Sequence, residues 1–136
     1  EKRGSIGLNR KIIMNINLLE DWVSCLNNAQ LEELVSMYSK EGILFATFDK
    51  TPLDNPQLIR QYFSDFLSRD GAGVELENST VHHTKLGENY HNSNGLYTFF
   101  YSENDQLVRH KARFTFIFNN QNTGSILHHH SSVIPT

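Results

Sequence analysis

The sequence predicts an α+β fold, with helices first and antiparallel strands after them. The apolar residues of the first half recur with the spacing of amphipathic helices, clearly so in 18–26 and 58–67. From Val74 onward the spacing changes to every second residue, which is typical of strands with one buried face. The chain has 136 residues, 38% of them hydrophobic, which suits one domain with its own core. We therefore expect three helices packed on one face of a curved antiparallel sheet.

The three helices are expected before residue 74. The apolar face of the first helix follows two residues, Asn15 and Asn17, either of which can cap it. A second apolar face within 31–42 predicts a helix that ends at the glycine closing this range. The third helix begins at Asn55 and Pro56, because asparagine caps well and proline fits the first helical turn.

The strands are separated by polar and glycine-containing turns. A short apolar run between the second and third helices predicts one strand ahead of the main group. A polar interruption at 92–95 separates residues 90–91 from the aromatic strand that follows. The expected strands are 43–48, 74–86, 96–101, 107–118 and 126–133.

The composition excludes several classes of function. The formal net charge is −3, and an acidic balance gives no support to a nucleic-acid-binding surface. No apolar run approaches the roughly 20 residues that span a bilayer. The single cysteine, Cys25, excludes an intrachain disulfide and a cysteine zinc cage, and its helical setting indicates a packing thiol. No phosphate-binding loop, nucleotide fingerprint or hydrolase elbow is present, so we expect no cofactor.

Residues 1–14 are expected to form a flexible leader ahead of a domain at 15–136. The leader is consistent with what remains after cleavage of a signal peptide or a tag. Met14 can also be a native start, in which case the leader is vector-derived. Localisation therefore stays open between the cytoplasm and export after removal of a signal peptide.

The candidate site lies on the last two strands. Alternation places His128 and His130 on one face of the final strand and His129 on the other. A neutral imidazole can accept a proton near pH 7, and Arg113 on the neighbouring strand can hold a carboxylate. The alternative is that the histidines are satisfied strand residues or lie at an interface. Two histidines spaced His-x-His can also bind a metal, but no third ligand is near, so no metal is expected.

The orientation of Arg113 is open at this stage. It shares a face with two further cations, and such a face is usually solvated. The opposite face of the same strand carries three phenylalanines and is expected to lie under the helices. Arg113 therefore points into water or a partner subunit, unless a bulge turns it toward the pocket.

Three stretches of the chain resemble the NTF2-like (SnoaL-like) superfamily, the cone-shaped fold of nuclear transport factor 2, ketosteroid isomerase and polyketide cyclases. The closest resemblance is to SgcJ/EcaC-type proteins and the association domain of calcium/calmodulin-dependent kinase II. The similarity runs from about Leu18 to Pro135. The stretches are 51–67, 112–118 (ARFTFIF) and 128–132 (HHHSS).

The resemblance implies a cone with a pocket between sheet and helices, and dimers or larger rings formed by sheet-to-sheet contact. It also marks Arg113, His128 and His130 as family-pattern positions. Phe116 stands where the kinase association domain presents an arginine, which weakens an anion site of that type. The general-base aspartate of ketosteroid isomerases has no counterpart here.

Two functions follow as expectations. The first is binding of a small acidic or carbonyl-bearing molecule in the cone pocket, with isomerase-like or cyclase-like acid–base catalysis if the protein is an enzyme. His128 or His130 would then move the proton, Arg113 would hold an oxyanion and Tyr97 would donate a hydroxyl hydrogen. The alternative is a non-enzymatic homo-oligomeric association module, at least a homodimer, with histidines and aromatic residues at the subunit interface. No nucleic acid or membrane partner is expected.

Overall fold

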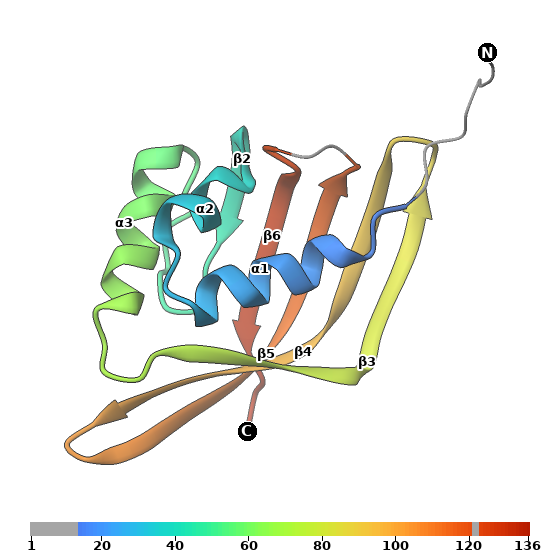
Figure 1. Cartoon of the computed structure of the whole chain (residues 1–136). Helices are drawn as coiled ribbons and strands as arrows, with labels where there is room; N and C mark the ends of the chain where they lie inside the picture. The colour runs from blue at the N-terminus through green and yellow to red at the C-terminus, as the bar shows by residue number, and fades with distance from the viewer. Residues whose placement is uncertain (1–13, 121–122) are drawn as a thin grey trace.

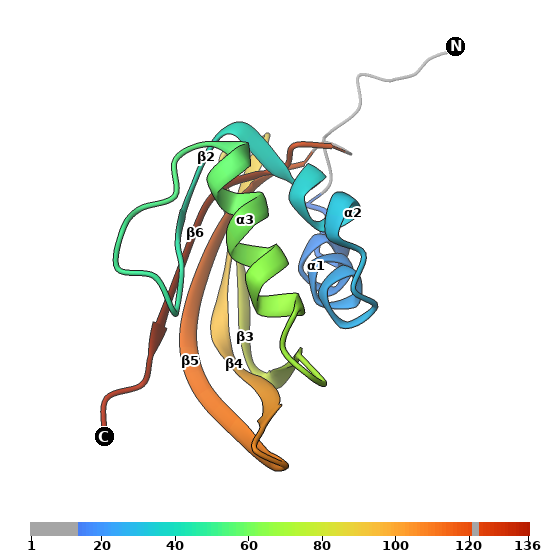
Figure 2. The ribbon, with the colours of Figure 1, turned by 90° about the vertical axis from the view of Figure 1, so that its left-hand side faces the viewer.

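The computed structural model describes residues 14–120 and 123–136, so the expected leader lies outside the described residues except for Met14. Within this part of the chain, three helices lie on one side of a five-stranded sheet (Figures 1 and 2). The elements are α1 (Asn17–Asn27), α2 (Leu31–Ser36), β2 (Tyr38–Phe45), α3 (Pro56–Leu67), β3 (Gly73–Leu86), β4 (Tyr90–Glu103), β5 (Gln106–Asn119) and β6 (Ile126–Val133). The predicted α+β class is confirmed.

The first and third helices form where the apolar spacing predicts them. The side chains of α1 that face the sheet are buried, with Trp22 at the centre of this face. The cap position of α1 is Ile16, whose side chain makes no capping hydrogen bond. Asn15, one of the two expected caps, lies one residue earlier, and its Oδ1 accepts a hydrogen bond from the Asn17 amide at 3.2 Å. Asn55 caps α3 as expected, since its Oδ1 accepts a hydrogen bond from the Leu58 amide at 2.9 Å.

The second helix is shorter than predicted, and the strand after it begins earlier. Helix α2 ends at Ser36, and Tyr38 is the first residue of β2 instead of the last apolar position of a helix. Pairing with β6 explains the difference, since the Ile126 amide donates to the Met37 carbonyl at 2.8 Å. Gly42 permits the close approach of β2 to β6, because a Cβ at this position would lie only 2.7 Å from the Ile126 carbonyl oxygen. Tertiary pairing thus outweighs the helical spacing.

The sheet has the strand order β2-β6-β5-β4-β3. Strand β2 runs parallel to β6, whereas the other neighbours are antiparallel, so the expected antiparallel sheet contains one parallel pair. Strand β4 continues through the polar segment 92–95, because β5 pairs with it from Tyr90 to Glu103. The predicted interruption is therefore wrong.

The core fills the space between the helices and the sheet. Phe114, Phe116 and Phe118 on β5 are buried there, as the alternation predicts, and the ring centroid of Trp22 lies 5.2 Å from that of Phe116. We call this side the inner face of the sheet and the side away from the helices the outer face (Figure 2). None of the helices described is long and apolar enough to cross a membrane.

Candidate functional site

A buried histidine lies at the centre of the inner face. His129 is 2% exposed and its ring lies between two tyrosine hydroxyls. Its Nδ1 is 2.8 Å from the hydroxyl oxygen of Tyr38, and its Nε2 is 2.9 Å from that of Tyr97. The ring of Phe116 stacks on the imidazole at a centroid distance of 3.8 Å. The three polar side chains come from β2, β6 and β4, so the sheet register brings them together.

Further polar groups extend this arrangement in both directions. The indole Nε1–H of Trp22 donates to the hydroxyl of Tyr38 at 3.0 Å. On the other side, the hydroxyl of Ser131 is hydrogen-bonded to that of Thr47, which is only half-buried. A chain of polar groups therefore runs from the core at Trp22 toward the surface at Thr47.

Burial sets the protonation of this chain. Burial, followed by the nearby His128 and His130, lowers the pKa of His129 well below its usual range, so the imidazole is neutral. Burial also raises the pKa of both tyrosines, and a weaker, opposite effect on the pKa of Tyr97 comes from its hydrogen bond to Ser131.

One tautomer uses the polar hydrogens of Trp22, Tyr38 and His129 in turn. Tyr38 accepts from the indole, so its own hydrogen can donate to Nδ1 of His129. The Nε2–H of His129 then donates to the hydroxyl oxygen of Tyr97. We assign this Nε2–H tautomer on hydrogen-bonding grounds. The result is a series of neutral donors and acceptors from Trp22 to Tyr97.

The space beside this chain is small. A cavity of about 10 Å³ is lined by Trp22, Thr47, Tyr62, Tyr97, His129 and Ser131, with apolar neighbours. A single water molecule needs about this much room. The interior of the cone is therefore packed, and an organic ligand enters only if a lining side chain moves.

The four residues singled out from the sequence lie on opposite sides of the sheet. Tyr97 is on the inner face and fully buried. His128, His130 and Arg113 are on the outer face, where they lie opposite Ile117, Thr115 and Ser132 in the β5–β6 pairing. The structure therefore brings His128, His130 and Arg113 to one surface and separates them from Tyr97.

The outer face has an aromatic centre near the β2 edge. The ring of Phe45 lies between the two outer histidines, at centroid distances of 5.7 Å from His128 and 5.6 Å from His130. Burial, and then the neighbouring His130, lowers the pKa of His128, so both effects favour its neutral form. Phe45 is 39% exposed and Ile43 is 37% exposed, so apolar surface remains uncovered here.

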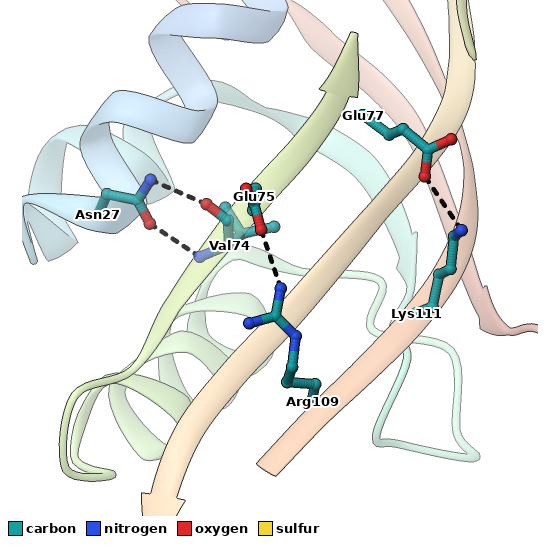
Figure 3. Close-up of polar contacts among 6 residues, drawn as sticks. All are labelled: Asn27, Val74, Glu75, Glu77, Arg109 and Lys111. Carbon is teal, nitrogen blue, oxygen red and sulfur yellow. Dashed lines mark hydrogen bonds and ion pairs between the residues drawn. The ribbon is translucent and has the colours of Figure 1, made fainter. Parts of the chain in front are cut away.

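Charged pairs lie on the same face toward β3. Arg109 is 3.0 Å from Glu75, and Lys111 is 3.1 Å from Glu77, each pair bridging over β4 (Figure 3). Both pairs are solvent-exposed. Arg113 is the next cation along β5, and within the described part of the chain its side chain has no hydrogen bond or ion pair. One free guanidinium therefore lies beside the aromatic centre.

The sequence reasoning missed the role of two residues. The apolar face within 31–42 predicts a helix that includes Tyr38, and the predicted catalytic histidines are His128 and His130, without His129. The alternation did contain a signal, because it separated His129 from His128 and His130. No signal linked Tyr38 to it, since that contact depends on the parallel β2–β6 pairing. Among the described residues, no group of three or more His, Cys, Asp or Glu is placed to hold a metal ion.

Comparison with known families and structures gives a consistent result. Residues 11–135 match the family model described as calcium/calmodulin dependent protein kinase II association domain. A comparison with curated protein sequences gave no significant match.

Several solved structures share the fold at low sequence identity. A calcium/calmodulin dependent protein kinase II association domain from Xanthomonas campestris is 24% identical, with a TM-score of 0.77 over 88% of this chain and 84% of that one. An NTF2-like protein with a cystatin-like fold from Novosphingobium aromaticivorans is 10% identical, with a TM-score of 0.70 over 87% and 78%. A ketosteroid isomerase-like protein from Erwinia carotovora atroseptica is 11% identical, with a TM-score of 0.71 over 95% and 100%. These likenesses support the NTF2-like, cystatin-like cone.

Proposed function

This chain belongs to the calcium/calmodulin dependent protein kinase II association domain family, and from that membership we propose that it is a homo-oligomeric association domain. The outer face of its sheet packs against the same face of a second copy. The observation that carries the proposal is the one-sided arrangement of the helices, which leaves the outer face uncovered by this chain (Figure 2).

The chemistry of the outer face supports a second copy as its occupant. Phe45 and Ile43 supply exposed apolar surface between half-buried strand residues. The ion pairs over β3 to β5 supply a polar margin. An apolar centre with a polar rim is the usual organisation of protein interfaces. In a two-fold dimer both copies use the same surface, so the interface contains the aromatic centre of each copy.

The experiment is a concentration series by light scattering and by thermal melting. A stable dimer buries roughly 800 Å² on each partner, and its melting temperature rises with protein concentration. We expect a mass of at least two chains and a melting temperature that rises as the protein concentration is increased. A monomeric mass at every concentration, with an unchanged melting temperature, contradicts the proposal.

The buried His129 favours a second candidate function, binding of a small acidic or carbonyl-bearing molecule inside the cone. In this function His129 and Tyr97 supply the acid–base and hydrogen-bonding groups, because they are the ones on the inner face. His128, His130 and Arg113 then belong to the interface. Ligand entry requires displacement of a lining side chain, since the cavity holds about 10 Å³.

A thermal-shift screen tests this second candidate. The probes are small carboxylates, steroids and polyketide-like carbonyl compounds, applied to the wild type, to Tyr97→Phe and to Tyr90→Phe. Tyr90 is an exposed tyrosine on the same strand and serves as the control. We expect a ligand to stabilise the wild type and Tyr90→Phe but not Tyr97→Phe. Equal stabilisation of all three proteins removes the interior site from consideration.

A further inference from the structure

A cavity beside α3 does not involve the outer face or His129. It has a volume of about 270 Å³ and lies between α3 and the loop that joins β2 to α3. Figure 2 shows this loop arching beside α3. Its walls include the aromatic rings of Phe48, Tyr62 and Phe66. Its volume is close to the lower end of the range for small-molecule sites.

Backbone and side-chain hydrogen bonds hold the loop at its base and at its tip. Leu44 and Leu53 exchange two backbone hydrogen bonds of 2.9 Å, which closes the base of the loop. At its tip, Asp49 accepts a hydrogen bond from the Thr51 amide at 2.9 Å. Helix α3 begins immediately after it under the cap described above. The cavity is therefore bounded by fixed backbone on two sides.

The aromatic wall is also fixed by its packing. Phe48 is stacked on Phe66 at a centroid distance of 6.2 Å and meets the edge of His110 at 5.1 Å. The hydroxyl of Tyr62 accepts a long hydrogen bond of 3.4 Å from the Phe48 amide. Phe48 nevertheless remains 36% exposed, so its ring presents surface to the cavity and the solvent.

Charge at the cavity is negative. Asp49 and Asp65 contribute two carboxylates and Arg69 one guanidinium, so one negative charge remains. The guanidinium is already engaged, with its central carbon 4.4 Å from the ring centroid of Tyr101. Within the described part of the chain, each carboxylate uses one oxygen, Asp49 toward Thr51 and Asp65 toward Gln61. The second oxygen of each is open to a donor.

We infer that this cavity is a binding site for a small organic cation, an ammonium or guanidinium group on an apolar body. The cation meets the free carboxylate oxygens of Asp49 and Asp65. The apolar body lies against the aromatic wall, whose ring faces attract positive charge as well. An organic anion is disfavoured because the two carboxylates outnumber the single, occupied guanidinium.

The test is an amide-detected NMR titration with 2-phenylethylammonium as the probe. Its matched controls are 2-phenylethanol, which is neutral, and 3-phenylpropanoate, which is an anion of similar shape. The variants are Asp49→Asn and Asp65→Asn, in which the amide oxygen can still accept the hydrogen bonds from Thr51 and Gln61. Asp54→Asn is the control variant, since Asp54 lies in the same loop but does not line the cavity.

We expect saturable shifts at the Phe48 and Tyr62 amides with the ammonium probe. Each cavity variant weakens binding about three- to tenfold, whereas Asp54→Asn leaves it unchanged. Equal affinity for the alcohol, preference for the carboxylate, or no saturable shift up to about 10 mM overturns the inference. The oligomeric mass, measured on the same samples, reports separately on the association proposal.

Discussion

Nε2 of His129 lies 2.9 Å from the hydroxyl oxygen of Tyr97 on the inner face of the sheet, while His128 and His130 on either side of His129 point outward. Three consecutive histidines therefore serve two surfaces. The middle one joins a buried polar chain, and the outer two flank an exposed aromatic ring. The period of a strand alone produces this division.

The buried chain predicts a large loss of stability in His129→Ala. The substitution removes the ring that stacks on Phe116 and takes one hydrogen-bond partner from each of two buried tyrosine hydroxyls. We expect the free energy of unfolding to fall by about 3 kcal/mol or more, measured by urea denaturation. His82→Ala is the matched control, since His82 is exposed, and it should change stability by less than about 0.5 kcal/mol. Similar losses in the two variants would show that the buried chain contributes little.

The same histidine predicts a dependence of stability on pH. The pKa of His129 is well below its usual range in the folded state, so the unfolded chain binds its proton first as pH falls. Stability contributed by neutral His129 is therefore complete above about pH 6.5 and declines as pH falls below it. The decline approaches about 1.4 kcal/mol per pH unit until the folded state is protonated.

Urea denaturation between pH 7.5 and pH 5 measures this slope. His83, His91 and His128 also have lowered pKa values, mainly through burial, so they add to the slope in the same direction. His129→Gln should make the slope shallower, because glutamine does not titrate. An unchanged slope in His129→Gln would contradict the assignment of a neutral buried imidazole.

A third prediction concerns the junction between α1 and β3. The side chain of Asn27 donates to the Val74 carbonyl at 2.9 Å and accepts from the Val74 amide at 2.8 Å (Figure 3). Asn27→Ala removes both bonds, so we expect a loss of about 1 to 3 kcal/mol. Its neighbour Asn28 is the control, because its side chain makes one exposed bond to Ser24. The free energy of unfolding is measured by thermal or urea denaturation. A larger loss in Asn28→Ala than in Asn27→Ala would refute this account.

Much of the fold follows from sequence periodicity. The buried faces of α1 and α3 and the alternation of β5 and β6 are local patterns, and they were predicted at nearly their observed positions. The end of α2 was not predicted correctly, because Tyr38 fits the apolar face of a helix as well as it fits a strand. Only the pairing with β6, some 90 residues later along the chain, decides between them, as the 91-residue separation of Tyr38 and His129 illustrates.

The candidate site was predictable only in part. Alternation separates His129 from His128 and His130, and it gives the direction of Arg113 once the covered face is known. It does not show that the interior is packed, since the remaining volume depends on how Trp22 and Tyr97 fill the cone. The cavity at the β2–α3 loop could not be predicted from the sequence either, because it depends on the conformation of the loop.

The most direct test of the association proposal is sedimentation equilibrium of Phe45→Glu beside Leu58→Glu. Phe45 is 39% exposed on the outer face, and Leu58 is 43% exposed on the helix side, so each change places a charge on a similarly exposed position. We expect Phe45→Glu to sediment as a monomer and Leu58→Glu to keep the mass of the wild type, because only the first buries a charge between copies. An oligomer that survives Phe45→Glu, or a wild type that is itself monomeric, would contradict association through the outer face.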